Sequence, residues 1–435
     1  MRRALLYATF NGVANCTNGI GRQTKTLLSA IERRWDEVTA VTGPLTPYLA
    51  IPTPGPRTWA YDPQQLGTAT RVVQARGGRI LHLPHDTAPP FWSPPVWTQL
   101  SAAAVRTAAT IAADYDEVLL IAVDTPFLGS GRVHRTLPSE LTARIHVLLA
   151  PYGTSYIHDR PPDPWRLGWE RTGLGAVGGR VHVADIGAFL TRHLVRRFDV
   201  DPACFVPWRS SLDLTAPDFT PMDRAQAAAV LAEFEIPTDR PIVMFIGRSD
   251  PTKGFDLLID ALRPIADNVH LAAVVVAGPG RDPLIPEYIE QINRARVRAS
   301  LVTQFTRDLP RALAAHPATR VAVCPSRGES LANVPFEVSL WARRSGPVIV
   351  APNRDGFVEQ ISDGVNGLLY DPDQDGALTT GIRRALALGP GAAAMLRTAA
   401  HQRVVDSRDV VPNLADTARW CFQLSRVGGY SSVRS

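Results

Sequence analysis

The chain has 435 residues, more than one ordinary hydrophobic core accommodates, so its length predicts two domains. Hydrophobic residues make up 45% and charged residues 20%, which is typical of a soluble globular protein. The formal charge of +5 suits an anionic ligand, but no dense basic tract accompanies it, so the sequence does not indicate a nucleic-acid surface.

The N-terminus, MRRALLYATFNG, combines two arginines with a short apolar run, which superficially resembles a signal peptide. The run is only about six residues and no small-residue cleavage site follows, so we interpret Ala4 to Ala8 as a buried strand. No apolar stretch approaches the roughly 20 residues that span a bilayer. Neither a disulfide-rich density nor a C-x-x-C pair is present, which favours free thiols in a cytoplasmic protein. The cysteines are Cys16, Cys204, Cys324 and Cys421.

The first half alternates strand-like and helix-like runs. Its helices include Thr24 to Arg34 and Ser101 to Asp114. Its predicted strands are Ala4 to Ala8, Val38 to Val41, Arg79 to Leu83, Val118 to Val123, Ile145 to Ala150 and Val181 to Ala184. Proline-rich stretches predict long loops, which in a compact domain are usually binding surfaces or lids. These stretches are Pro44 to Pro56, Pro84 to Pro95 and Pro161 to Pro164.

The second half shows the alternation more clearly, after a linker-like stretch from Thr215 to Met222. Its strands are apolar on both faces, which predicts a parallel sheet covered by helices on both sides. They are Ile242 to Ile246, Leu271 to Ala277, Leu301 to Phe305, Val321 to Cys324, Val348 to Ala351 and Gly367 to Tyr370. The expected architecture is therefore α/β, with two doubly wound, Rossmann-like domains facing each other across a ligand-binding cleft.

Only two of the 46 basic Lys and Arg residues are lysines, Lys25 and Lys253. Where arginine dominates so strongly, a remaining lysine marks a place that needs a compact ammonium, unless it survived by chance. Lys253 lies between a buried strand and an amphipathic helix, close to Gly247 and Arg248. A strand, a glycine-bearing turn with two cations and a helix N-terminus together predict a phosphate site.

A second constellation runs from Cys324 to Pro372, with Glu329 and Glu337 at its core. If a helix begins near Ser330, the two carboxylates lie about 12 Å apart along its axis. Unpaired amides of the first turn would then point at an anion between them. They belong to Ser330, Leu331, Ala332 and Asn333. A diphosphate flanked by two sugars meets these demands, whereas a capping acid on a solvated helix face is the alternative.

These motifs resemble the retaining, GT-B-fold glycosyltransferases of family four (group 1 type), mainly over Ile242 to Pro372. The resemblance implies that Arg248, Lys253 and the neighbouring Gly247 hold the diphosphate of a nucleotide-sugar donor. By the same resemblance, Glu329 contacts hydroxyls of the donor sugar and Glu337 binds the ribose. Where many members have Glu-Gly-Phe-Gly, this chain has Glu-Ser-Leu-Ala, so its sugar pocket is lined differently.

The segment CTNGIGRQTKTLLSAI resembles the glycine-rich loop of the same family. Gly19 and Gly21 would let the backbone approach the donor phosphate or sugar. The segment also mimics the G-x5-K-T of a phosphate-binding loop, but Thr24 replaces the glycine expected before Lys25. A P-loop nucleoside triphosphatase is therefore the poorer interpretation.

Family members often place a histidine after a mid-domain strand, and Tyr152 occupies the position that we align with it. His158 and the pair His85 and Asp86 are further acceptor-binding or catalytic candidates, although a histidine beside a strand is more often structural. Three acidic segments fall at predicted element ends and favour solvated acids, so we predict no metal and no cofactor besides the donor substrate. They are Asp114 to Asp116, Asp199 to Asp201 and the stretch from Asp371.

The resulting hypothesis is a cytoplasmic enzyme that moves a sugar from a nucleotide diphosphate sugar to a small natural-product acceptor, such as an aminocyclitol or glycoside. We predict domains at 1–214 and 215–406, with the C-terminal helix in 407–435 packing back on the first domain, as the resemblance implies. Its apolar face would consist of Leu414, Ala418, Cys421, Phe422 and Leu424.

Other functions stay open. A polysaccharide or lipid-linked acceptor is one, because Leu190 to Phe198 could form a basic amphipathic patch, although the pattern favours a solvated helix face over membrane association. The others are a phosphorylase or epimerase on the same fold and a non-catalytic nucleotide-sugar binder. The sequence does not indicate the oligomeric state.

Overall fold

A computed structural model describes residues 1–15, 18–55, 58, 60–159, 161–277 and 282–423. The chain forms two compact units, one of Met1–Asp213 with Arg408–Ser435 and the other of Leu214–Ser407. These bounds differ by one residue from the domain bounds expected from the sequence. Cys16, Leu424 and the rest of the C-terminus lie outside the described residues.

The first unit is built on a seven-stranded parallel sheet with the order β3-β2-β1-β4-β5-β6-β7. Its strands are β1 (Arg3–Ala8), β2 (Leu45–Pro52), β3 (Ile80–Leu83), β4 (Glu117–Val123), β5 (Ile145–Ala150), β6 (Val181–Asp185) and β7 (Phe205–Pro207). Strand order reverses between β1 and β4, which makes this the topological switch point where ligands bind in such sheets. The expected doubly wound architecture is confirmed for this unit.

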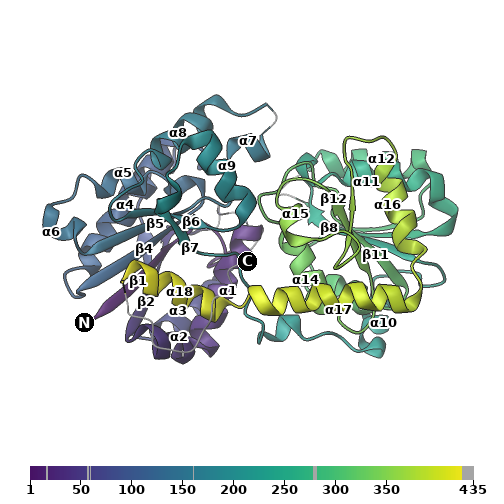
Figure 1. Ribbon diagram of the computed structural model, residues 1–435, viewed down its shortest axis with the longest axis horizontal. Coiled ribbons are helices and arrows are strands. Elements are labelled where there is room, and N and C mark those ends of the chain that lie inside the picture. The colour runs from purple at the N-terminus through teal and green to yellow at the C-terminus, as the bar shows by residue number, and fades with distance from the viewer. Residues whose placement is uncertain (16–17, 56–57, 59, 160, 278–281, 424–435) are drawn as a thin grey trace. The chain divides into compact units, whose positions relative to one another are not determined.

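Helices pack on both faces of this sheet (Figure 1), and they bury its apolar strands on both sides. They are α1 (Gly19–Arg33), α2 (Trp35–Thr42), α3 (Pro63–Gln74), α4 (Pro94–Ile111), α5 (Ser130–His134), α6 (Ser139–Thr142), α7 (Ser155–His158), α8 (Pro164–Leu174), α9 (Ala188–Phe198) and α18 (Val410–Cys421), with short 3-10 turns η1 (Thr125–Phe127) and η2 (Pro202–Cys204). Two of the expected proline-rich loops end where Pro94 and Pro164 begin α4 and α8. Proline suits the first helical turn because its missing N–H would have no partner there.

The prediction of a strand at Val38 to Val41 is wrong, because these residues lie within α2. Asp36 and Glu37 stand in the first turn of this helix, where acids are favoured by its dipole. Trp35 and Val38 are buried on one helical face, and this helical spacing outweighs the strand preference of valine.

The prediction of a loop from Pro44 to Pro56 is wrong over most of its length, because β2 occupies it between β1 and β3. Pro47 is tolerated in this interior strand for a geometric reason. The amide of Leu49 donates to the carbonyl of Arg79, so every second residue of β2, including Pro47, has its nitrogen on the side of β3. Pairing with β3 begins only at Leu49, two residues after Pro47. Its missing N–H therefore removes no bond of the sheet.

The second unit is built on a six-stranded parallel sheet with the order β10-β9-β8-β11-β12-β13. Its strands are β8 (Ile242–Arg248), β9 (His270–Val276), β10 (Ala299–Val302), β11 (Thr319–Val323), β12 (Val348–Pro352) and β13 (Leu368–Tyr370). Its helices are α10 (Arg224–Glu233), α11 (Phe255–Leu262), α12 (Leu284–Ala295), α13 (Asp308–Ala315), α14 (Asn333–Trp341), α15 (Phe357–Gln360), α16 (Ala377–Leu386) and α17 (Pro390–Ser407), with 3-10 turns η3 (Pro217–Phe219), η4 (Pro251–Lys253) and η5 (Arg263–Asn268). The switch point lies between β8 and β11, so this unit too is doubly wound, as expected.

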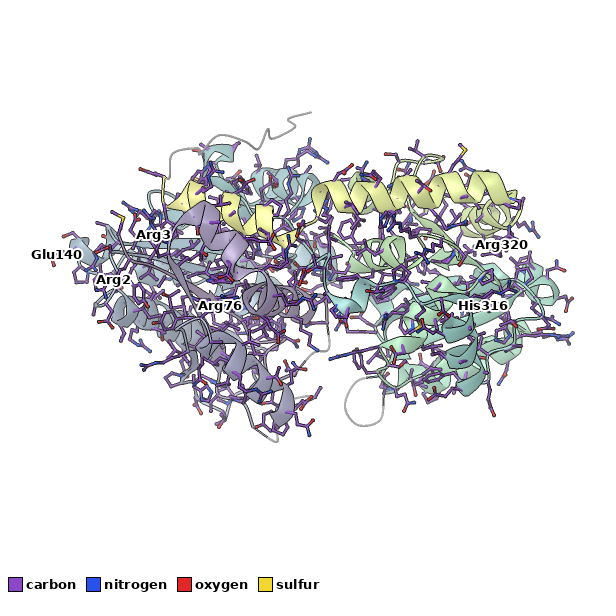
Figure 2. All side chains as sticks on the ribbon, turned by 90° about the horizontal axis from the view of Figure 1, so that it is seen from below. Arg2, Arg3, Arg76, Glu140, His316 and Arg320 are labelled. Carbon is purple, nitrogen blue, oxygen red and sulfur yellow. The ribbon has the colours of Figure 1, made fainter. Side chains whose placement is uncertain are left out.

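Two charged side chains labelled in Figure 2, Arg3 and Arg320, lie at the amino ends of strands and have structural partners. The guanidinium of Arg3 at the start of β1 forms an ion pair with Glu117 at 3.0 Å. Arg320 at the start of β11 donates to the carbonyl of Leu388 at 2.9 Å. No helix among the described residues has the combination of length and apolarity that a membrane crossing requires.

The chain leaves the first unit after Asp213 and returns to it at Arg408, and Arg34 contacts the chain at both places. Leu212 and Arg408 are joined by a backbone hydrogen bond of 2.8 Å. The Arg34 guanidinium contacts Asp409 at 2.6 Å and Asp213 at 3.6 Å. Asp213 is only 1% exposed, so its charge depends on these contacts. α18, which follows, packs on α1, α2 and β7 of the first unit.

α18 also covers two buried histidines of the sheet. His182 lies edge-on to Trp420 with ring centroids 4.7 Å apart, and His146 lies edge-on to Phe422 at 5.7 Å. Burial and the neighbouring charge of Arg180 lower the pKa of His146 to about 3 and that of His182 to about 4. Both imidazoles are therefore neutral in the folded protein at physiological pH.

We expect the double variant His146→Gln/His182→Gln to be less sensitive to acid than the wild type. The unfolded chain takes up protons near the usual histidine pKa of 6.5, whereas the folded one does not, so the histidines cost stability as the pH falls below 6.5. When the pH falls from 7 to 5, the free energy of unfolding of the variant should rise relative to that of the wild type by as much as roughly 3 kcal/mol. Thermal unfolding of both proteins across this range measures it, and a constant difference would contradict the assignment.

Candidate active site

The turn between β8 and α11 presents two cations at the carboxyl edge of the second sheet. Asp250 shapes this turn by accepting from the amide of Thr252 at 2.9 Å and from its hydroxyl at 2.7 Å. The guanidinium of Arg248 binds the other oxygen of Asp250 at 3.1 Å. Burial opposes ionisation of Asp250, but these hydrogen bonds and the charges of Arg248 and Lys253 outweigh it and lower its pKa. The carboxylate is therefore charged and holds the turn in shape.

Gly254 is required where this turn meets α11. Its φ of +67° lies in the left-handed region, and a Cβ there would come within 2.1 Å of the carbonyl oxygen of Pro325. Arg327 ties the same two loops together, since its guanidinium donates to Asp256 at 2.8 and 2.5 Å and to the carbonyl of Pro251 at 2.6 Å. The cation turn and the loop after β11 thus form one braced surface at the switch point.

Lys253 and Glu329 meet on this surface in an ion pair of 2.5 Å. Their side chains are 22% and 11% exposed, so the pair is sheltered but remains open to solvent. Ser326 donates a hydrogen bond of 3.3 Å to the same carboxylate oxygen. Burial raises the pKa of the nearby Cys324 thiol to about 12, so Cys324 offers no thiolate here.

The expected helix start near Ser330 is wrong, because α14 begins at Asn333. Glu329 therefore lies in the loop before the helix, and the 12 Å estimate along a common axis does not apply. The expected free amide of Ala332 is also wrong, since it donates to the side chain of Gln360 at 3.1 Å. Glu337 lies inside α14 and is half-buried.

The loop after β12 supports this segment from the other side. The amide of Gly356 donates to the carbonyl of Glu329 at 2.9 Å. A Cβ at Gly356 would lie 2.1 Å from the carbonyl oxygen of Ser330, so only glycine allows this close approach. Ser330 is buried and Leu331 is half-buried beside it. The loop that carries Glu329 is thus held by backbone contacts with the loop after β12 on one side and with the turn after β8 on the other.

In the first unit, the predicted glycine-rich loop follows β1 and leads into α1. Asn18 caps α1 by accepting from the amide of Gly21 at 2.9 Å, so this amide already has an intramolecular partner. Gly12, with a φ of +101°, packs so closely that a Cβ there would lie 2.6 Å from the carbonyl oxygen of Gly21. Gly19 is the first residue of the helix. Glycine is thus required at position 12, where the loop packs closely on α1.

Tyr152 follows β5 and belongs to a buried polar cluster at the carboxyl edge. Its hydroxyl accepts from the indole of Trp208 at 3.0 Å, and burial raises its pKa. The carboxylate of Asp124 raises the pKa of both Tyr152 and Tyr7 in the same cluster. Asp124 directly follows β4, is 7% exposed and has a φ of +70°, a strained conformation for a residue with a side chain. Burial raises the pKa of Asp124 itself, against the opposing charge of Arg166.

The other first-unit candidates lie in loops of the same edge. His85 is half-buried and contacts the ring of Phe91 edge-on at 6.0 Å. Asp86 is exposed and accepts from the amide of Ala88 at 2.9 Å, which is a turn-forming role. His158 ends α7, and its ring lies so close to Gly153 that a Cβ there would be 2.0 Å from Nε2.

The structure brings Arg248, Lys253 and Glu329 onto one surface, with Gly247 and Ser330 beside them, and places Glu337 further along α14. Sequence reasoning missed Asp124, Asp250 and Arg327. A polar residue directly after a buried strand is the signal that could have found Asp124 and Asp250, whereas the contacts of Arg327 depend on tertiary structure. Among the other acids identified in the sequence, Asp201 and Asp371 accept backbone amides of their own turns, and Asp116 accepts from the amide of Arg2 at 2.6 Å. Within the described ranges, no three His, Cys, Asp or Glu side chains are arranged to hold a metal ion.

Residues 229–403, nearly all of the second unit, match the family model of the glycosyl transferases group 1. The second unit is thus similar to the group 1 glycosyl transferases over these residues. A relative at the sequence level, the D-inositol 3-phosphate glycosyltransferase of Geodermatophilus obscurus, is 32% identical over 227 residues, covering 50% of this chain and 48% of the relative. This chain thus spans about half the length of the curated relatives that it matches. The resemblance to group 1 glycosyltransferases is confirmed.

Solved structures with similar folds extend the likeness beyond the second unit. Sucrose-phosphate synthase from Thermosynechococcus elongatus superimposes with a TM-score of 0.71 at 19% identity, covering 98% of this chain and 100% of that one. Anabaena HepE, solved in complex with UDP and glucose, gives a TM-score of 0.70 at 16% identity, with 97% and 99% covered. At these identities the likeness concerns the fold, and the expected GT-B class is confirmed.

Proposed function

We propose that the chain transfers a sugar from a nucleotide diphosphate sugar to an acceptor hydroxyl, with retention of anomeric configuration. The bond between the anomeric carbon and the diphosphate oxygen breaks with its electron pair passing to that oxygen. The acceptor oxygen bonds to the anomeric carbon and gives up its proton to the departing diphosphate. Negative charge grows on the departing diphosphate. Cations fixed beside the departing diphosphate therefore lower the barrier to transfer.

The observation that carries the proposal is the pairing of Lys253 with Glu329 beside Arg248 in a domain similar to the group 1 glycosyl transferases. An ammonium has three donors, so Lys253 can keep its bond to Glu329 and still donate to a phosphate oxygen. It would then link the leaving group to the carboxylate that orients the donor sugar. Anabaena HepE, solved with UDP and glucose, supports a nucleotide-sugar donor by its similar fold.

For the acceptor, we favour a small polyhydroxylated molecule such as a cyclitol or glycoside. The relative named for D-inositol 3-phosphate, a phosphorylated cyclitol, supports this class. We propose that Asp124 accepts a hydrogen bond from an acceptor hydroxyl, and its position at the switch point of the first sheet supports this role. We propose no metal ion and no cofactor in the reaction.

The test is a transfer assay in two steps. A thermal-shift screen of UDP, GDP, ADP and TDP selects the nucleotide, since a ligand at 100 times its Kd stabilises the protein by about 2.7 kcal/mol. Sugars carried by that nucleotide are then offered with a panel of cyclitols and glycosides, and NMR gives the anomeric configuration of the product. We expect a glycoside with the configuration of the donor. Release of sugar phosphate that depends on phosphate, an epimerised donor, or binding without turnover would each contradict the proposal.

Glu337→Gln should weaken binding of the selected nucleoside diphosphate at least tenfold. A carboxylate that accepts two ribose hydroxyls contributes roughly 1.5 to 3 kcal/mol, and the neutral amide loses the charge that strengthens these bonds. Isothermal titration of both proteins measures the change. Unchanged affinity in a folded variant would remove Glu337 from the ribose site.

A further inference from the structure

Seven aromatic side chains form one continuous cluster in the first unit. Their ring centroids are linked at 5.2 to 6.5 Å from each ring to the next, which is the range of favourable aromatic contact. The members of this aromatic wall are Phe10, His85, Phe91, Trp92, Trp97, Trp165 and Trp169. A cluster of this size beside a binding edge calls for a role beyond packing.

The wall stands at the carboxyl edge of the sheet. Phe10 follows β1, Trp92 lies in the connection after β3, and Trp165 lies in the helix reached from β5. Trp169 fixes the wall to the end of β4, because its indole donates to the carbonyl of Thr125 at 2.8 Å. The rings therefore flank the switch point between β1 and β4, next to Asp124.

Two rings of the wall remain exposed although the ring between them is buried. Trp92 is 40% exposed and Trp165 is 43% exposed, and both contact the fully buried Trp97. The indole nitrogen of Trp97 has no hydrogen-bond acceptor among the described residues, which is costly for a buried donor. A ligand oxygen or a water held between the rings would supply one.

The composition of the wall distinguishes between candidate ligands. Five of its seven members, His85 and the four tryptophans, carry a ring nitrogen at their edge, and an acyl chain offers no partner to such a group. The negative faces of aromatic rings attract the partly positive C–H groups on one face of a sugar or cyclitol ring. The carboxylate of Asp124 beside the wall would accept from the hydroxyls that such a ring carries at its edge.

The geometry points to the aromatic wall as the platform on which a six-membered polyhydroxylated ring of the acceptor stacks, with Trp92 and Trp165 as the contacting rings. The inference rests on the proposed function, because it names the acceptor class for the same reaction. In this inference the acceptor is recognised by stacking on the aromatic wall, and its hydroxyls are recognised by hydrogen bonds at the edge of the acceptor ring.

The test measures binding to the whole protein without turnover. Saturation-transfer NMR with irradiation of aromatic protons is recorded for methyl β-D-glucopyranoside, methyl α-D-mannopyranoside and myo-inositol, with octanoate as the acyl probe. We expect at least one ring compound to receive saturation on its C–H protons, and its Kd to rise at least fivefold in Trp92→Ala and in Trp165→Ala. Trp92→Phe, which keeps a ring, should retain most of the affinity.

Trp420→Ala is the matched control, because Trp420 is also 40% exposed but lies on α18 against His182. Its affinity for the ring compound should equal that of the wild type. Absence of saturation transfer to all three ring compounds, equal weakening in Trp420→Ala, or binding of octanoate alone would overturn the inference. Nucleoside diphosphate binding, measured in the same variants, separates this outcome from a failure of the proposed function, which would show as absent nucleotide binding in the wild type.

Discussion

Lys253→Ala is expected to lower turnover by about 100- to 1000-fold, or roughly 2.7 to 4 kcal/mol of barrier, with the fold intact. The reason is the loss of the ammonium to which we assign the stabilisation of the departing diphosphate. The variant also leaves Glu329, which is 9% exposed, without its cation. Steady-state kinetics with saturating donor measure kcat, and circular dichroism checks the fold.

Lys253→Arg separates charge from shape. Arginine keeps the charge but replaces a point donor with a longer planar fork, which does not fit the tight turn before Gly254. We expect only partial recovery of activity relative to the alanine variant. Arg263→Ala is the control, because the Arg263 side chain is 67% exposed and its ion pair with Asp260 is long at 3.8 Å. Full activity of Lys253→Arg would mean that charge alone matters at this position.

Arg34→Met should destabilise the protein by about 3 to 5 kcal/mol. The substitution keeps much of the side-chain volume but removes the cation that joins Asp213 and Asp409. Asp213 is 1% exposed, and its remaining partners include the neutral hydroxyl of Ser29 at 2.5 Å and the distant cation of Arg33 at 3.9 Å. Denaturant unfolding followed by tryptophan fluorescence measures the loss.

Arg384→Met provides the comparison for this effect. Arg384 binds Asp363 at 3.0 Å, but both side chains are nearly half exposed, so the pair should contribute less than about 1 kcal/mol. Equal destabilisation by the two substitutions would show that burial of the Arg34 network does not matter.

The doubly wound fold could be predicted because most strands are apolar runs bounded by turns. Where the prediction failed, tertiary context outweighed local pattern. Val38 to Val41 reads as a strand by residue preference, but Trp35 and Val38 bury one helical face of α2. The prolines of β2 predict a loop. Pro47 is tolerated in the strand because its nitrogen lies on the side of β3 but before the first residue that pairs with β3, so the sheet loses no hydrogen bond.

For the site, the sequence predicts the residue types and their order but not their contacts. Spacing alone suggested that Glu329 and Glu337 share one helix axis, whereas α14 begins at Asn333. The pairing of Lys253 with Glu329 and the brace of Arg327 to Asp256 connect segments far apart in sequence, so no local pattern reveals them. The strain at Asp124 is likewise a property of the folded backbone.

Equilibrium binding of UDP, GDP, ADP and TDP by isothermal titration tests most directly whether the second unit holds a nucleotide-sugar donor. We expect one of the four to bind the wild type, and Lys253→Ala and Glu337→Gln each to weaken that binding at least tenfold while the protein stays folded. Binding of none of the four, or binding that both variants leave unchanged, would contradict a donor site built on these residues.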